Sequence, residues 1–159
     1  MGIPSDPLIY RLKNKFSVSI EGVGTSEFQS VTGVRKEIAP IEFRAGGRNL
    51  ATKIPGNVTI PPVQMSIGKT QDFTLYQWFR EVADLRRELG SGQPDGAFTR
   101  TVDIVQYGNG GGVLDRYRLF QAWPSLFDAG EWDATSDEVL ITQIELQIYN
   151  WEPLGLDFV

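Results

Sequence analysis

The stretch that decides the fold is LFQAWPSLFDAGEWDATSDEVLITQIELQIYNW, residues 119–151. It opens with a bulky apolar run that we expect to break at Trp123-Pro124. It then crosses an acidic loop and ends as a long segment in which apolar and polar residues alternate. Such alternation predicts a strand with one face in a core and one polar face. Because the stretch holds no obvious nucleophile, base or metal-ligand set, it predicts an architecture rather than an active site.

The size and charge of the chain limit its function. Its 159 residues suffice for one domain, and 41% hydrophobic and 22% charged residues are ordinary globular usage. Fifteen basic and 20 acidic residues give a net charge of −5, which argues against a surface built to grip nucleic acid.

Two residue types are missing from the sequence. There is no Cys, so disulfides and thiolate metal sites are excluded, and no His, the commonest general base near neutral pH. No apolar stretch approaches the length of a membrane span, and the N-terminus lacks the apolar core of a signal peptide. We therefore expect no membrane insertion by this chain.

The rest of the chain is mainly β in pattern. Residues 1–14 read as an arm, because Pro4 and Pro7 resist regular structure. Residues 15–22 alternate and predict a half-buried strand, which makes a hairpin with one long or broken strand over residues 27–44. Further strands are expected at residues 58–67, 98–107, 115–123 and 138–151.

Two segments depart from the strand pattern. Residues 44–57 hold three glycines, a proline and three basic residues with little periodicity, and predict a long mobile loop. Residues 72–89 predict a helix, with Thr70 or Asp72 as a start cap and Gly90 at the end. Its apolar face repeats at helical spacing through Leu75, Trp78, Phe79, Val82, Leu85 and Leu89.

Candidate chemical motifs are weak. The GKT of residues 68–70 resembles the end of a phosphate-binding loop, but the glycine that the motif needs five residues earlier is Val63. The GNGGG of residues 108–112 predicts a hairpin turn. A cluster of carboxylates lies close together in one polar loop, unlike the pair of a glycosidase or a calcium-binding helix-loop-helix: Asp128, Glu131, Asp133, Asp137 and Glu138. We assign no catalytic residue, metal ligand or cofactor.

The order of the segments resembles contractile tail tube proteins, which form the inner tube of phage tails and of related extracellular contractile injection systems. The matching motifs are DPLIYRLKNKFSVSIEG (6–22), FQSVTGVRKEI (28–38), AGGRNLATKIPGNVTI (45–60), SIGKTQDFTLYQWF (66–79), RTVDIVQY (100–107), YRLFQAWPSLFDA (117–129) and DEVLITQIELQI (137–148). Departures are SIGKT, where the family commonly carries Arg before the Gly, and the apolar tail WEPLGLDFV (151–159).

The resemblance implies a mainly β subunit, a β-sandwich or barrel-like domain with one flanking α-helix. Six copies would close into a ring whose strands form one continuous β-barrel, and rings would stack into a tube. The implied partners are other copies of the chain, a sheath protein, baseplate and tube-terminating proteins, and the cargo protein or DNA inside the lumen. The tube would assemble in the bacterial cytoplasm and belong to a phage virion or a contractile injection particle.

Three residue sets follow as expectations within that resemblance. Contacts between rings are expected from the loop residues Arg44, Gly46, Gly47, Arg48, Asn49, Lys53, Pro55 and Gly56. The lumen is expected to be polar and net acidic, lined by Ser17, Ser19, Glu21, Gln143, Glu145 and Gln147, with Phe16, Val18, Ile20, Leu140, Ile144, Leu146 and Ile148 in the core. The outward, sheath-facing side of the helix is expected to carry Arg80, Glu81, Asp84, Arg87 and Glu88.

Other functions stay open at this point. Within the tube class, the chain could be a baseplate tube-initiator or the secreted ring protein of type VI secretion. Outside it, a small-ligand or carbohydrate-binding β-barrel could use Trp123 and Trp151 to stack a sugar. A carboxylate-based hydrolase is disfavoured by the absence of His.

Overall fold

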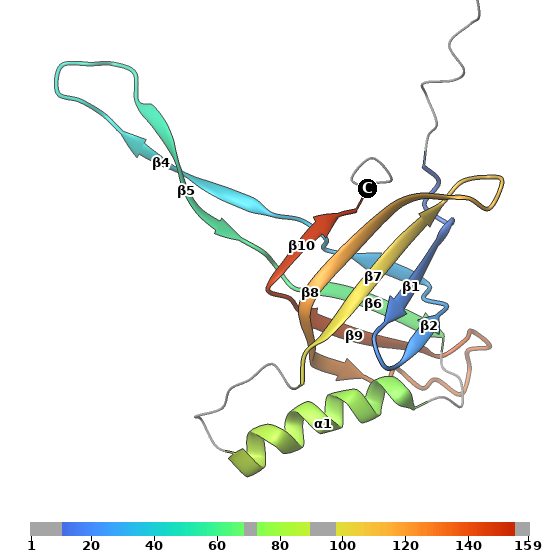
Figure 1. The fold of residues 1–159 in the computed structure, drawn as a ribbon. Coiled ribbons are helices and arrows are strands. Elements are labelled where there is room, and N and C mark those ends of the chain that lie inside the picture. Colours follow the sequence, from blue (N-terminus) through green and yellow to red (C-terminus); the bar gives the residue numbers. More distant parts are fainter. Residues whose placement is uncertain (1–10, 69–72, 90–97, 155–159) are drawn as a thin grey trace, which may run out of the picture.

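The computed structural model describes residues 11–68, 73–89 and 98–154, with only the backbone of Ser26 and of residues 85–89 (Figure 1). Of the expected N-terminal arm, residues 1–10 lie outside this part. The described strands are β1 (Phe16–Ile20), β2 (Gly24–Ser26), β3 (Ser30–Thr32), β4 (Glu37–Phe43), β5 (Thr52–Thr59), β6 (Val63–Gly68), β7 (Arg100–Tyr107), β8 (Val113–Asp128), β9 (Ile141–Gln147) and β10 (Asn150–Pro153). The helix is α1 (Thr74–Leu89).

Most strands belong to one antiparallel path, in the order β2-β1-β7-β8-β9-β6-β3, and β10 also pairs with β8. The path ends at β2 and β3 and does not close on itself within the described residues. The mainly β class is therefore confirmed, while a barrel closed within one subunit is not present there.

Strand β8 joins two layers of the sheet. Its 16 residues pair first with β7, up to Ala122, and then with β9 from Trp123 onward. Close to the change of partner, Gln121 has a φ of 52°, and the register with β9 shifts between Pro124 and Leu126. The expected break at Trp123-Pro124 is therefore wrong. A proline, which lacks a backbone N–H, is tolerated at such a shift, so the strand bends from one layer into the other without ending.

The final strand follows one edge of β8 in two segments. Gln147 of β9 lies opposite Trp123, and Asn150 of β10 lies opposite Phe120. Between the segments, the Tyr149 N–H donates to the Phe120 carbonyl at 3.0 Å, which keeps the chain in line. The expected strand over residues 138–151 thus begins at Ile141 and is interrupted at residues 148–149.

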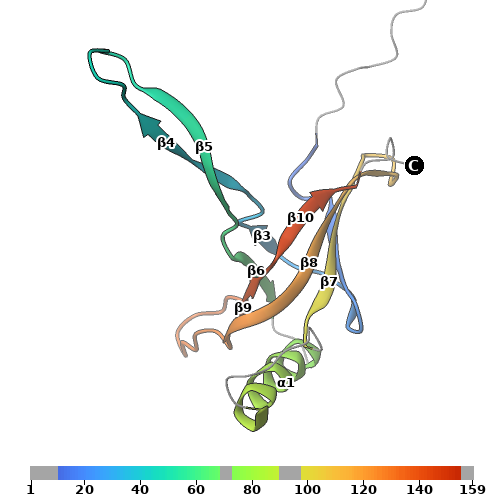
Figure 2. The same ribbon diagram turned by 60° about the vertical axis from the view of Figure 1, so that its left-hand side comes forward.

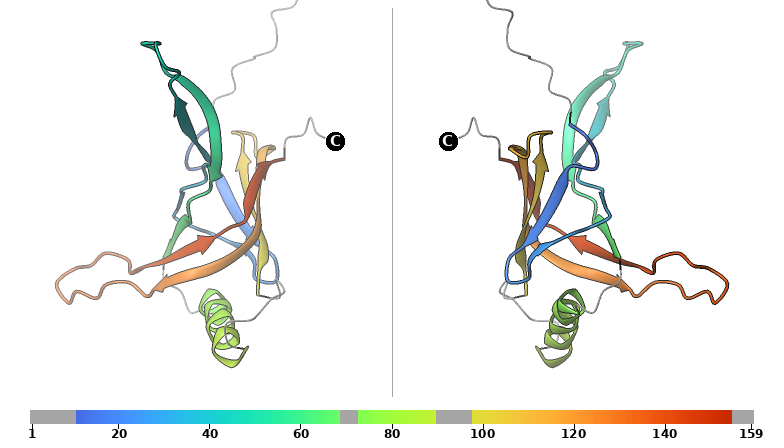
Figure 3. Two further views of the ribbon diagram at one scale, coloured as in Figure 1. Left: turned by 90° about the vertical axis from the view of Figure 1, so that its left-hand side faces the viewer. Right: turned by 90° about the vertical axis from the view of Figure 1, so that its right-hand side faces the viewer.

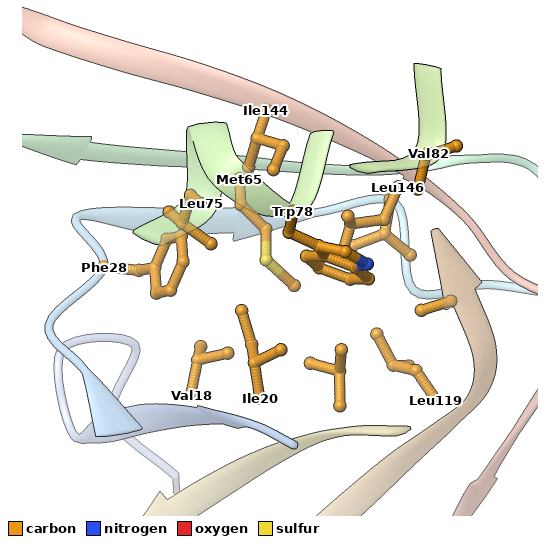
Figure 4. Close-up of a cluster of buried hydrophobic side chains, with 13 residues drawn as sticks. Val18, Ile20, Phe28, Met65, Leu75, Trp78, Val82, Leu119, Ile144 and Leu146 are labelled. Carbon is orange, nitrogen blue, oxygen red and sulfur yellow. The ribbon is translucent and has the colours of Figure 1, made fainter. Parts of the chain in front are cut away.

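The core lies between the two layers and is completed by the helix (Figure 4). One layer contributes Val18, Ile20, Val102 and Leu119, the other contributes Val63, Met65, Ile144 and Leu146, and α1 adds Leu75, Trp78 and Val82. Each is at most 9% exposed. Full burial of such side chains contributes about 1.5–3 kcal/mol apiece to folding, so this cluster is the main source of stability.

Helix α1 covers one end of the two layers (Figure 2). It begins within two residues of the expected start, and its apolar spacing puts Trp78 in the core with 1% exposure. The Trp78 indole N–H donates to the Phe98 carbonyl at 3.0 Å, and the Phe127 ring lies 5.4 Å from the Tyr76 ring. These contacts fix the helix against the start of β7 and the end of β8.

Strands β4 and β5 form a separate two-stranded sheet that projects from the rest (Figures 1 and 2). The expected loop over residues 44–57 is wrong in its second half, because β5 begins at Thr52. A register shift between Ile38 and Pro40 accommodates Gly56, where a Cβ would lie 2.5 Å from the Ala39 carbonyl oxygen. A β-bulge that needs glycine therefore reads in the sequence as a loop.

Two further expected strands are divided. Residues 27–44 supply β3 and β4, and residues 58–67 supply the end of β5 and most of β6. Gly33, with a φ of +94°, turns the chain after β3, where a Cβ would lie 2.7 Å from the Pro62 carbonyl oxygen. Pro61 and Pro62 separate β5 from β6, because neither can donate to a strand ladder.

Candidate assembly surfaces

The β4–β5 hairpin exposes apolar side chains on both faces. Ile41 and Ile54 are cross-strand neighbours on one face, and Ile38 and Val58 are neighbours on the other. The exposed fractions of these four lie between 47% and 57%, and Phe43 and Leu50 reach 63% and 84%. A soluble monomer rarely keeps so much apolar surface together, so the hairpin has the character of an interface.

The tip of the hairpin is basic and rich in glycine. Arg44, Arg48 and Lys53 are exposed, and Gly47 has a φ of +85° in the turn. The structure thus brings the whole inter-ring set together on one projecting element. Five of its members lie in the turn, Arg44, Gly46, Gly47, Arg48 and Asn49, and three lie in β5, Lys53, Pro55 and Gly56.

The expected lumen residues fall on two different faces. Ser17 and Ser19 lie on the outer face of the layer that contains β1 and β7, where Ser19 is opposite Asp103. Glu21 follows the end of β1, and its carboxylate accepts the Thr101 N–H at 3.2 Å. Gln143, Glu145 and Gln147 lie on the outer face of the other layer. Because the core separates the two layers, the structure does not bring the two groups together (Figures 3 and 4).

One of these faces is almost entirely polar. On the layer β3-β6-β9-β8, cross-strand pairing aligns Thr32, Gln64 and Glu145, and aligns Ser30, Ser66, Gln143 and Asp128 in the next row. We call this face the polar wall; Leu126 is its exposed apolar member. The Ser30 and Ser66 hydroxyls are 2.6 Å apart, and the face is hollowed by about 240 Å³.

Of the polar wall, sequence reasoning found Gln143 and Glu145 and missed the part that β3 and β6 supply. Ser30, Thr32, Gln64 and Ser66 each alternate with buried or half-buried neighbours, which is a signal of a strand face. That signal cannot predict that β3 and β6 share a layer with β9, because the layer is set by pairing between strands far apart in the sequence.

The polar side of α1 is partly paired within the subunit. Arg80 contacts Asp84 at 3.5 Å, one helical turn away, and Glu81 contacts Arg100 at 3.4 Å. The side chains of Arg87 and Glu88, and of Leu85 and Leu89 on the apolar side, lie outside the described part.

The carboxylate cluster of residues 128–138 is a structured loop. The Asp133 carboxylate accepts the Thr135 N–H at 3.0 Å and the Thr135 hydroxyl at 2.8 Å. These hydrogen bonds, the backbone one first, hold the pKa of Asp133 below its usual value. Among the described residues, no group of three or more carboxylates is placed to hold a metal ion. Lys69 and Thr70 of the GKT motif lie outside the described residues.

The geometry is one of exposed edges, a projecting hairpin and a polar face, and the comparison with protein families agrees with it. The family described as T4-like virus tail tube protein gp19 matches residues 12–152. The chain belongs to this family. Among the residues that the structure describes, no helix is long and apolar enough to cross a membrane.

Solved structures share the fold of this tail tube family member. A chain in the baseplate of the anti-feeding prophage (AFP) has 23% identity and a TM-score of 0.76, over 98% of this chain and 99% of that one. A chain in the sheath-tube complex of the extracellular contractile injection system PVC has 21% identity and a TM-score of 0.74, over 92% and 93%. Hcp1 from Flavobacterium johnsoniae is more distant, with 13% identity and a TM-score of 0.57, over 88% and 94%. No curated protein matches the chain in sequence.

Proposed function

We propose that the chain is a non-catalytic subunit of the inner tube of a contractile injection system or phage tail. Six copies close into a ring, and rings stack into a conduit for cargo protein or DNA. The observation that carries this proposal beyond family membership is the β4–β5 hairpin, whose exposed apolar faces have no use in an isolated subunit. The tube is part of a phage tail or contractile injection particle, assembled in the bacterial cytoplasm.

Ring closure is supported by two free strand edges. In the described chain, β3 pairs only with β6, and residues 123–128 of β8 pair only with β9. These are the two edges of the layer β3-β6-β9-β8. Free edges are an aggregation hazard unless another strand covers them, and closure of neighbouring copies into one barrel covers both.

The polar wall then lines the lumen. Each copy contributes Asp128, Gln143 and Glu145 with the hydroxyls of β3 and β6, so the channel is hydrophilic and acidic. Like charge and little apolar surface keep DNA or an acidic protein from sticking. Ser17, Ser19 and Glu21 lie on the other layer, so this arrangement places them outside the channel.

Labelling of single cysteines tests the lumen assignment, and the native chain has no cysteine to interfere. A bulky thiol reagent should modify Glu145→Cys slowly in intact tubes, through the tube ends, and Ser19→Cys faster. Both should react alike in dissociated subunits. A slow Ser19→Cys and a fast Glu145→Cys in tubes would put the lumen on the other layer.

The β4–β5 hairpin is proposed to make contacts between rings. Its basic tip suits an acidic neighbour, since the chain carries a net charge of −5. Deleting residues 47–53 removes the turn and the start of β5 and should leave rings that do not stack. Tubes of normal length from that deletion would refute the assignment.

The outward side of α1 is proposed to face the sheath. Arg80, Glu81 and Asp84 lie on it, with Arg87 and Glu88 expected there. Reversing the charges of Glu81, Asp84 and Glu88 should weaken sheath assembly while tubes still form. Baseplate and tube-terminating proteins are the further proposed partners, at the two tube ends.

A further inference from the structure

A second hollow lies between the two layers, at the end away from α1. It has a volume of about 700 Å³ and a mixed lining. The apolar and aromatic side chains come from both layers, Phe16, Val31, Val34, Ile104, Tyr117 and Trp151, and the polar ones are Lys13, Gln29, Ser30, Thr32 and Gln106. The six apolar and aromatic side chains are only partly buried. We call it the open-end groove. Its volume lies within the range of about 300–1,000 Å³ that is typical of small-molecule pockets, so it has room for a large side chain.

One wall of the groove carries an unsatisfied hydrogen-bond donor. The indole N–H of Trp151 is buried and has no partner among the described residues. Its ring lies 6.0 Å from that of Tyr117, and the Lys36 ammonium lies 4.9 Å from the ring centre. A buried donor without an acceptor is unfavourable, so an occupant that brings an acceptor oxygen, such as a carboxylate, would stabilise this end of the groove.

Two lysines lie at the groove, Lys13 in its lining and Lys36 over the Trp151 ring. Within the described chain no acidic side chain forms an ion pair with Lys13. Lys36 forms an ion pair with Glu152 at 3.2 Å. The groove thus suits an apolar or aromatic group that is flanked by negative charge.

The loop between β8 and β9 presents such a group. Trp132 is 72% exposed, between Glu131 and Asp133, and residues 128–140 contain no Lys or Arg. The loop projects well beyond the strands that it connects (Figure 3). An exposed tryptophan with acidic neighbours is complementary in polarity and charge to a groove that presents aromatic side chains beside Lys13 and Lys36.

We propose that Trp132 of one copy inserts into the open-end groove of a neighbouring copy in the tube, with Glu131 and Asp133 against Lys13 and Lys36. This inference rests on the proposed tube function and names one contact that holds copies together. The loop that carries Trp132 and the open-end groove are different surfaces of the same chain, so the contact is head-to-tail. Contacts of that kind close into rings or continue as filaments. Buried aromatic anchors of this type commonly dominate interface energies.

Cysteine cross-linking tests the contact directly. The double variant Lys13→Cys with Glu131→Cys keeps Trp132 and changes two exposed side chains. In assembled tubes, mild oxidation should give a ladder of disulfide-linked oligomers, because disulfides require Cα atoms within about 7 Å. The matched control, Ser19→Cys with Glu131→Cys, should give no ladder.

A second variant pair separates anchoring from folding. Trp132→Ala should raise the protein concentration needed for assembly tenfold or more, while Trp132→Phe should restore most of the assembly. The near-ultraviolet circular dichroism of dissociated subunits should stay close to wild type in its core signals. Normal tubes from Trp132→Ala, or tubes without the Lys13–Glu131 ladder, overturn this inference and leave the tube function standing. A wild-type chain that never assembles overturns both.

Discussion

Ile41 of β4 lies directly opposite Ile54 of β5, and the two side chains are 51% and 47% exposed. A cross-strand pair of this kind contributes about 0.2–1 kcal/mol to hairpin pairing. Half of each surface is nevertheless left for another molecule. Mutation of this pair should therefore weaken the assembly much more than it weakens the folded subunit.

Replacing both residues, as Ile41→Ser with Ile54→Ser, should lower the free energy of unfolding of the isolated subunit by less than about 1 kcal/mol. The concentration needed for tube formation should rise tenfold or more, because the apolar contact with the next copy is lost. Chemical denaturation and light scattering measure the two effects. Ile41→Val with Ile54→Val is the control and should assemble normally. Unchanged assembly by the serine variant would contradict the interface.

Trp78 is the anchor of α1 on the sheets, with 1% exposure and its hydrogen bond to the Phe98 carbonyl. Trp78→Ala should destabilise the dissociated subunit by about 3–5 kcal/mol, measured by urea unfolding. Trp78→Phe keeps most of the apolar contact but leaves the Phe98 carbonyl without this donor, which costs about 1–3 kcal/mol. Equal stability of Trp78→Ala and wild type would mean that α1 is not part of the folding core.

Gly33 should not tolerate a side chain. Its φ of +94° and the 2.7 Å distance from an added Cβ to the Pro62 carbonyl oxygen predict a loss of about 1–3 kcal/mol for Gly33→Ala. Gly46→Ala is the matched control, since an added Cβ there meets nothing within 4 Å. Comparing thermal unfolding of the two variants checks the prediction, and similar melting temperatures would argue against the turn described after β3.

The pKa of Asp133 should depend on Thr135. Thr135→Val removes the hydroxyl donor and should raise the pKa part of the way to its usual value, while Thr135→Pro also removes the N–H donor and should raise it further. The pKa is lowered in the folded protein. Its contribution to stability is thus present above the unfolded value of about 3.9 and is lost as pH falls through the folded value. Carboxyl NMR titration follows the change, and an unaltered Asp133 titration in Thr135→Pro would exclude this cause.

The sequence predicts strand faces well where alternation is strict. Val18, Ile20, Ile144 and Leu146 are buried as expected, and the 3.6-residue spacing around Trp78 locates the helix. Phe16 and Ile148 are only partly buried. The expectation for Leu140 is wrong, since Leu140 precedes β9, is only partly buried and is not part of the core cluster. Thr142 is buried instead, with 4% exposure.

The sequence does not predict which strands share a layer. Period-two alternation places Ser19 and Glu145 on outer faces but cannot tell that these faces belong to different layers. The bend of β8 near Gln121 decides that, through pairings made more than a dozen residues apart. The sequence also does not predict that the β4–β5 hairpin extends through residues 52–57. The reason is local, since Pro55 and Gly56 are typical of a turn, whereas here Pro55 pairs with Pro40 and Gly56 lies at the register shift next to it. The open-end groove is formed by residues of both layers, so no local sequence pattern predicts it.

Electron microscopy of the purified protein, over a range of concentrations and with its baseplate and sheath partners added, tests the tube assignment most directly. Sixfold rings with a central hole, stacking into tubes of constant diameter, are the predicted result. A uniform population of monomers under every condition would contradict the account.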